Sequence, residues 1–214
     1  MRGTADRSEV RAPGSSRRAV LVRGASLLLV PASLGRAASA GAADGPPAPA
    51  PADEHGRVTP SLPPPDIAVV CQDGTRARLR ALVHGRVTAL HPMFTSCTAT
   101  CPIQGAVLAK VQKLLPDRAA RGIQILSLSI DPQRDSPQAL RTWLARFHAG
   151  PGWLAAAPAD AADVLALRAF TGPGKNAADP HTTRVLILNR QGLLVWRTFD
   201  LPDAAEIADI LRKV

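Results

Sequence analysis

The sequence predicts an α/β fold in which strands and helices alternate along the chain, with an additional β-hairpin in front. From residue 66 onward, short apolar runs rich in Val, Ile and Leu, typical of buried strands, alternate with segments whose apolar residues recur at helical spacing. Hydrophobic residues make up 46% of the 214 positions, which is enough for one core. We therefore expect a single domain, residues 66–214, preceded by two segments of different composition.

Residues 1–40 have the features of an export signal peptide. Arg17-Arg18 supplies a basic start, residues 25–34 form a short apolar stretch, and Ala38-Ser39-Ala40 fits a cleavage site. The arginine pair also resembles the twin-arginine type of signal. The alternative is an uncleaved membrane anchor, but the apolar stretch is far shorter than the roughly 20 residues that a membrane span needs. We therefore expect an exported, periplasmic protein with no membrane span after cleavage.

Residues 41–65 are rich in Ala and Pro. This composition favours extended polyproline structure and cannot pack a core, so the segment is predicted to be a disordered tether. His55 lies in this tether and is interpreted as incidental rather than as a ligand.

The first half of the domain is predicted to contain a hairpin, a strand, a helix and a central strand. Asp73-Gly74 is a turn signal between two short β-prone runs, and the apolar, β-branched segments that follow are typical of interior strands. The helix has apolar residues broadly at helical spacing. The predicted elements are strands 67–71, 77–80, 87–91 and 123–130 and helix 103–115.

The second half adds two helices, a late hairpin and a terminal helix. Ser136 and Pro137 fit the N-cap and first residue of a helix, and Gly192 marks the hairpin turn. The predicted elements are helix 137–147, a short strand or loop at 153–154, helix 161–170, strands 184–189 and 193–198, and helix 202–211. This is the order of a thioredoxin-like fold with an additional N-terminal β-hairpin.

The formal net charge of +9 arises largely from the leader. Residues 1–40 hold seven of the 26 Lys and Arg but only two of the 17 Asp and Glu, which leaves a net charge of +4 for residues 41–214. The remaining basic residues form no long runs and are not interleaved with aromatic residues. The composition therefore argues against nucleic-acid binding.

Cys97 and Cys101 lie in the loop that joins strand 87–91 to helix 103–115. Because proline is favoured at the first helical position, Pro102 places Cys101 at the predicted N-cap. Helix N-termini lower thiol pKa values, so both thiols are expected to ionise readily and to act as a redox pair or bind a soft metal. A purely structural disulfide is the alternative, but a bridge across so short a loop stabilises a fold little.

Other reactive residues nearby are given structural interpretations. Cys71 ends an apolar run and is interpreted as a small buried side chain. His91 and Met93 precede the two cysteines and are assigned to strand packing, with an auxiliary ligand role as the alternative. Asp131 and Asp135 are interpreted as parts of a turn and helix cap, not as acid–base catalysts.

Three separate segments resemble the Sco/SenC family, thioredoxin-like copper chaperones that assist assembly of the copper centre of cytochrome c oxidase. Residues 94–102, FTSCTATCP, are similar to the family pattern F-T-x-C-x-x-x-C-P. Residues 129–137, SIDPQRDSP, resemble S-I-D-P-x-R-D-T-P. His181 stands eleven residues before Gly192, as the family's histidine stands before the glycine of its late hairpin. The resemblance covers roughly residues 66–214.

The resemblance implies that Cys97, Cys101 and His181 bind one copper ion per chain. Two thiolates and an imidazole suit Cu(I) in a low-coordinate site, whereas a structural zinc site asks for a fourth ligand. The implied protein is a periplasmic metallochaperone that delivers copper to an apo-acceptor such as a cytochrome c oxidase subunit. Oxidation of the cysteine pair would abolish binding, so a thiol–disulfide reductant is a second expected partner.

The alternative is an enzyme, a metal-independent thiol–disulfide reductase that acts on cysteines of an acceptor protein. Reductases of the thioredoxin type carry a cis-proline where this chain has Thr183-Arg184, and exchange chemistry needs no histidine. Peroxidase activity has less support, because Pro92, Thr95 and Cys97 do not match the peroxiredoxin spacing. The residues therefore favour a carrier.

Overall fold

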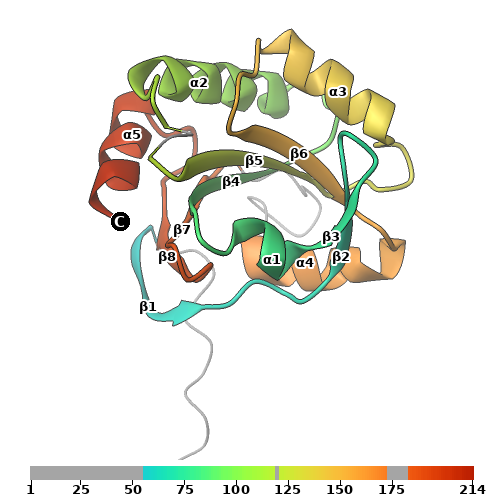
Figure 1. Cartoon of the computed structure of the whole chain (residues 1–214), viewed down its shortest axis with the longest axis horizontal. Coiled ribbons are helices and arrows are strands. Elements are labelled where there is room, and N and C mark those ends of the chain that lie inside the picture. The colour runs from blue at the N-terminus through green and yellow to red at the C-terminus, as the bar shows by residue number, and fades with distance from the viewer. Residues whose placement is uncertain (1–54, 119–120, 173–182) are drawn as a thin grey trace, which may run out of the picture. The chain divides into compact units, whose positions relative to one another are not determined.

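The computed structural model describes residues 55–118, 121–172 and 183–214. Within these residues, an eight-stranded mixed sheet forms the centre of the domain, in the order β1-β8-β7-β4-β5-β6-β2-β3 (Figure 1). The strands are β1 (Gly56–Leu62), β2 (Ala68–Cys71), β3 (Arg76–Arg78), β4 (Val87–Met93), β5 (Ile123–Ser129), β6 (Trp153–Pro158), β7 (Leu186–Leu188) and β8 (Leu194–Arg197). β4, β5 and β6 pair in parallel, and the other pairs are antiparallel.

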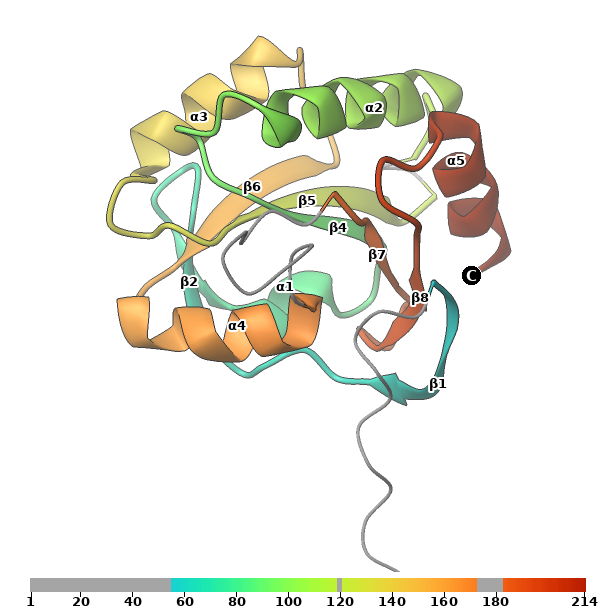
Figure 2. The same ribbon diagram turned by 180° about the vertical axis from the view of Figure 1, so that it is seen from behind.

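Helices cover both faces of this sheet (Figures 1 and 2). One face carries α2 (Thr100–Leu114), α3 (Pro137–Arg146) and α5 (Ala204–Lys213). The other carries α1 (Leu79–Val83) and α4 (Val164–Thr171), with a 3-10 turn at Ala161–Asp163 ahead of α4. The thioredoxin-like α/β order and the additional N-terminal hairpin, β2 with β3, are thereby confirmed.

The core is divided between the two faces of the sheet. Every residue of β4 and β5 is buried, as expected of central strands covered on both sides. Ala89 and Met93 pack in the core beneath α2, α3 and α5, whereas Leu90 packs in the core beneath α1 and α4. Side chains alternate between faces along a strand, so His91 points to the same side as Ala89 and Met93.

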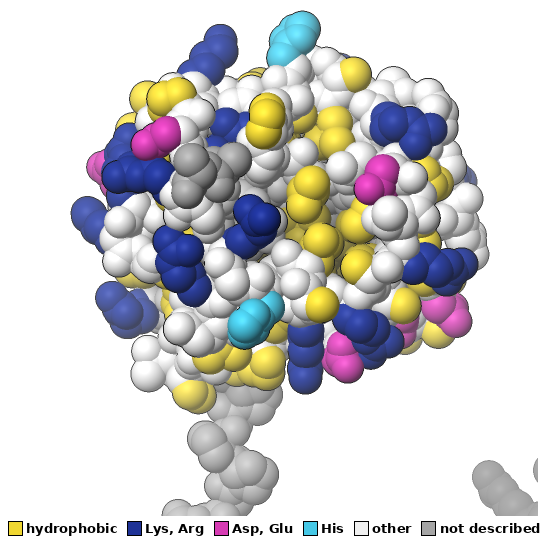
Figure 3. Space-filling model, viewed as in Figure 1, with side chains coloured by type: hydrophobic (Ala, Val, Ile, Leu, Met, Phe, Trp, Pro, Cys, Tyr) yellow, Lys and Arg dark blue, Asp and Glu magenta, His cyan; other side chains and the backbone are white. Residues whose placement is uncertain are grey.

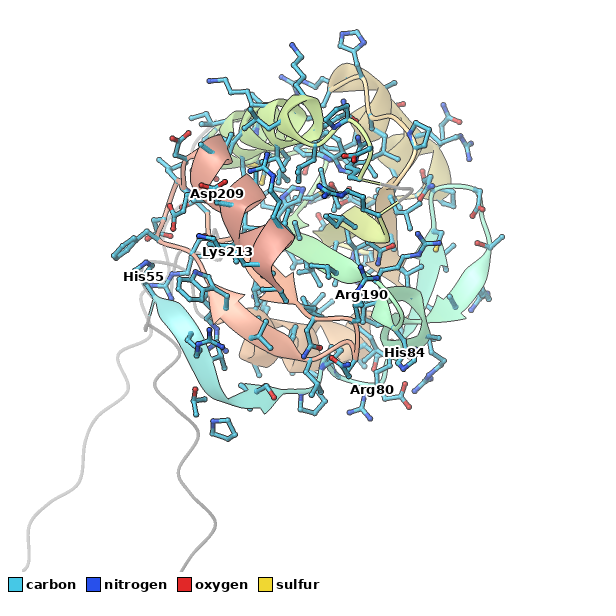
Figure 4. The ribbon with its side chains drawn as sticks, turned by 60° about the vertical axis from the view of Figure 1, so that its left-hand side comes forward. His55, Arg80, His84, Arg190, Asp209 and Lys213 are labelled. Atoms are coloured by element: carbon cyan, nitrogen blue, oxygen red, sulfur yellow. The ribbon has the colours of Figure 1, made fainter. Side chains whose placement is uncertain are left out.

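Two segments differ from their predicted structure. The strand expected at 77–80 ends at Arg78, and Leu79 begins helix α1 because Leu79 and Val83, one helical turn apart, both bury their side chains. The predicted tether also extends too far, because Gly56–Leu62 forms β1 and pairs with β8. Directly before β1, His55 (labelled in Figure 4) stacks on Phe199, with ring centroids 3.3 Å apart.

The reason for the second difference is that β1 is held by partners far along the chain. Its sequence contains Pro60, which an edge strand tolerates since one side of its backbone has no sheet partner. Val58 is buried in the core of the α1 and α4 face. The predicted export signal at 1–40 and tether residues 41–54 lie outside the described residues.

The described surface is mixed in charge. On the face shown in Figure 3, Lys and Arg side chains are scattered among acidic and apolar ones. Among the described residues, no helix combines the length and apolar character that crossing a membrane requires.

The predicted helix start at Ser136 is confirmed, and it yields a test of the fold. Ser136 is the N-cap of α3, and its side-chain oxygen accepts the N–H of Ala139 at 3.2 Å. Ser136→Ala is therefore expected to lower the free energy of unfolding by about 1 kcal/mol, measured by urea denaturation. Ser136→Asp, which keeps a capping oxygen, should retain the parent stability. Equal stabilities of parent and alanine variant would show that this cap contributes nothing.

Candidate metal centre

Cys97 and Cys101 lie where the chain leaves the carboxyl end of β4 and enters α2. Both side chains are buried, with 4% and 5% of their surface exposed. The N-cap of α2 is Ala99, so Cys101 is the second helical residue and not the N-cap as predicted. Pro102 is consequently the third helical residue. This placement costs little, because N–H groups of the first turn have no acceptor within the helix.

The sulfur of Cys97 takes over the capping role at this helix terminus. Ala99 has no side-chain acceptor to offer, and the backbone N–H of Cys101 instead donates to the Cys97 sulfur at 3.4 Å. The hydroxyl of Thr100 lies 3.9 Å from the same sulfur. These donors and the positive end of the helix dipole favour a thiolate at Cys97.

The two thiols differ in acidity, contrary to the expectation that both ionise readily. Burial raises the pKa of Cys97, but hydrogen bonds from the Cys101 thiol, from backbone N–H groups and from Thr100 outweigh it and lower this pKa to about 7. Burial, together with the hydrogen bond and the negative charge of Cys97, raises the pKa of Cys101 to about 12. The prediction assumed that the helix terminus acts equally on both sulfurs. The terminus instead stabilises the thiolate of Cys97, and this negative charge opposes ionisation of Cys101.

A buried carboxyl group holds the cysteine loop in place. Asp135, 2% exposed, accepts the backbone N–H of Thr95 at 3.1 Å, the Thr95 hydroxyl at 2.6 Å and the Ser129 hydroxyl at 2.6 Å. The predicted turn is confirmed, because the backbone N–H of Asp135 donates to the Asp131 carbonyl at 3.0 Å, but the cap of α3 is Ser136 and not Asp135. The SIDPQRDSP segment marked Asp135 as a residue of interest. The sequence did not reveal its partner, because Thr95 lies 40 residues away along the chain.

The structural interpretations of three other residues are confirmed. Cys71 is a buried free thiol in β2. Met93 is 1% exposed within the core. His91 is fully buried, and its Nε2 lies 2.7 Å from the Ser127 hydroxyl oxygen, so it contributes to a polar network inside the core.

The third predicted ligand, His181, lies outside the described residues, which resume at Thr183. The chain just beyond it is held against α2, because the side-chain N–H of Gln104 donates to the Arg184 carbonyl at 3.0 Å. Thr183 donates its hydroxyl to Asp200 at 2.9 Å. Among the residues the structure describes, no three His, Cys, Asp or Glu side chains group as metal ligands would. The structure therefore brings together two of the three predicted ligands.

A dithiol at the start of a helix, directly after a parallel strand of a sheet covered on both faces, defines a thioredoxin-like protein. Residues 68–214 match the model of the SCO1/SenC family. The chain belongs to this family.

Individual relatives agree with this assignment. The SCO1 protein homolog of Bacillus subtilis strain 168 is 33% identical over 76 residues, which is 36% of this chain and 38% of that protein. The chain thus spans about a third of the length of the curated relatives it matches. Bradyrhizobium japonicum ScoI, solved with copper bound, is 21% identical with a TM-score of 0.57 over 71% of this chain and 99% of that one. BsSco, a member of the Sco family of cytochrome c oxidase assembly proteins in which a disulfide switch was identified, is 21% identical. Its TM-score is 0.59 over 72% of this chain and 93% of that one.

Proposed function

We propose that this protein is a periplasmic copper carrier that binds one copper ion through Cys97, Cys101 and His181. It passes the ion by ligand exchange to an apo-acceptor such as a cytochrome c oxidase subunit. The observation that carries the proposal is the buried Cys97/Cys101 dithiol at the start of α2, in a chain of the SCO1/SenC family. Copper bound to ScoI of the same fold supports the choice of metal.

The chemistry of the two sulfurs fits a soft metal ion. Cys97, with a pKa of about 7, presents a thiolate near neutral pH, which is the form that binds Cu(I). Cys101 keeps its proton until a metal displaces it, because its pKa is raised to about 12. Loading therefore releases protons, and the affinity for copper rises with pH. A carrier benefits from this arrangement, since reprotonation of Cys101 assists release of the ion to an acceptor.

Oxidation of the dithiol would switch copper binding off. Forming a Cys97–Cys101 disulfide removes two electrons and two protons, which pass to an external oxidant such as an acceptor disulfide. The product has no thiolate to offer, so a thiol–disulfide reductant must restore the carrier. The disulfide switch for which BsSco was studied supports this part of the proposal.

A metal-independent thiol–disulfide reductase is the second candidate, and the same acidity pattern favours it. Exchange is fastest when the attacking thiol has a pKa near ambient pH, as Cys97 does. Cys101 would then lose its proton to the departing acceptor sulfur and attack the Cys97 sulfur of the mixed disulfide. This releases the acceptor as a thiol and leaves a Cys97–Cys101 disulfide. The two functions differ in their need for His181: the copper carrier uses its imidazole as a ligand, whereas the reductase does not need it.

Anaerobic titration of the reduced full chain with Cu(I), against a competing chelator, separates the candidates. We expect one ion per chain, and His181→Ala should weaken binding at least as much as the roughly 10- to 100-fold caused by loss of an outer-shell partner. His84→Ala is the matched control, because His84 follows α1 at the exposed surface. Absent binding, or binding that His181→Ala leaves unchanged, together with rapid reduction of a model disulfide, would support the reductase instead.

A further inference from the structure

A network of buried polar side chains lies behind the cysteine loop, and copper binding by itself does not explain it. Its centre is Ser127 on β5, whose oxygen accepts the indole N–H of Trp143 at 3.2 Å and that of Trp153 at 3.0 Å. The same oxygen lies 2.7 Å from Nε2 of His91. All four side chains are at most 3% exposed, so water does not compete for these contacts.

The contacts determine where the protons lie. An indole N–H can only donate, so the two tryptophans occupy both lone pairs of the Ser127 oxygen. The Ser127 hydroxyl proton is therefore directed at Nε2 of His91, which accepts it. A neutral imidazole that accepts at Nε2 carries its own proton on Nδ1. Burial lowers the pKa of His91 to about 4, which keeps the ring neutral at physiological pH.

Gln104 on α2 offers the complementary group. Its amide nitrogen donates to the Arg184 carbonyl, which leaves its side-chain oxygen as a free acceptor. Nδ1 of His91 and this oxygen are both buried, and among the described residues neither has a partner in normal hydrogen-bond geometry. The Gln104 side chain nevertheless faces His91 closely enough to oppose the lowering of its pKa. Pairing this donor with this acceptor would satisfy both buried groups.

We propose that His91 and Gln104 are positioning residues for the copper site: His91 orients the Gln104 amide, which holds the backbone at Arg184 against α2. Gln104 lies one helical turn after Cys101, on the same side of α2. Arg184 lies three residues after His181. The contact therefore ties the segment that follows the proposed imidazole ligand to the helix that carries one thiol. This inference rests on the proposed function, because it needs His181 to bind the metal.

The test compares two glutamines on α2. Gln104→Met removes the contact with Arg184. Gln112→Met removes the donation of its amide to the His148 carbonyl at 2.9 Å, and with it the two hydrogen bonds that its side-chain oxygen accepts from Arg118 and from the backbone N–H of Gly150. We expect Gln104→Met to weaken Cu(I) binding by about 10- to 100-fold, the loss typical of outer-shell partners. It should also change the thiolate-to-copper charge-transfer spectrum of the Cu(II)-loaded protein. Gln112→Met should change neither.

His91→Phe provides a second variant on the same path, in case Gln104→Met fails to fold. It removes the Nδ1 donor but keeps an aromatic ring, and its Cu(I) affinity should fall in the same direction. Affinities and spectra of Gln104→Met and His91→Phe equal to those of Gln112→Met, with His181→Ala still weakening the parent, would overturn the inference and leave the carrier intact. A parent chain whose copper binding is indifferent to His181→Ala would overturn both.

Discussion

Cys97→Ser is expected to abolish tight copper binding, with Cu(I) affinity falling by more than about 100-fold in competition titrations. Cys97 is the thiol that ionises near neutral pH, and a serine hydroxyl does not supply a soft thiolate. Cys71→Ala is the matched control, because Cys71 is also a buried free thiol but lies in β2, which β5 and β6 separate from β4, the strand that leads to Cys97. An unchanged affinity in the Cys97 variant would contradict the assignment of this residue as a ligand.

The same asymmetry sets the pH dependence of thiol modification in the reduced, metal-free protein. The thiolate fraction of Cys97 rises as pH increases through about 7, so its alkylation rate should reach half its maximum there. Cys101 stays protonated until pH approaches about 12, and Cys71, whose pKa burial also raises, stays unreactive. Mass spectrometry after brief treatment with iodoacetamide at about pH 8 should therefore find a single label, on Cys97. Equal labelling of Cys97 and Cys101 would contradict this order.

Asp135→Asn is expected to produce the largest loss of stability, about 2–4 kcal/mol in the free energy of unfolding measured with urea. The carboxyl group accepts three donors from Thr95 and Ser129 inside the protein. An amide of the same size loses the charge and turns one end into a donor that faces other donors. Because Thr95 precedes Cys97 by two residues, the folded variant should also bind copper more weakly.

Asp131→Asn is the control for this substitution. Asp131 lies in the same turn and pairs with Arg134 at 3.3 Å, but that arginine side chain is 76% exposed. Exposed ion pairs contribute little, so the control should change stability by less than about 1 kcal/mol. Equal losses in the free energy of unfolding for the two variants would show that the buried contacts of Asp135 stabilise the fold no more than the exposed ion pair of Asp131 does.

Much of the fold could be predicted because its signals are local. Ser136 and Pro137 mark the start of α3 by their own capping chemistry, and the apolar run of β5 identifies a central strand. The turn signals at Asp73-Gly74 and Gly192 likewise located both hairpins. Here the tertiary structure agrees with what each segment prefers by itself.

The errors arose where partners distant in sequence decide the structure. β1 exists because β8 pairs with it, and its Pro-containing sequence carries no strong strand signal. The Asp135 contact with Thr95 spans 40 residues, and the His91 contact with Ser127 spans 36. The acidity of each thiol depends on which helix N–H reaches which sulfur, and spacing along the chain does not specify that.

The sequence by itself determined the α/β order, the family and the identity of the two cysteines, because these follow from periodicity, turn chemistry and three short motifs. Only the tertiary structure decided that Cys97 ionises first, that Asp135 holds its loop, and that a buried network reaches from two tryptophans to Gln104. The physical reason is that pKa values and buried hydrogen bonds depend on distances between atoms that the chain brings together only when it folds.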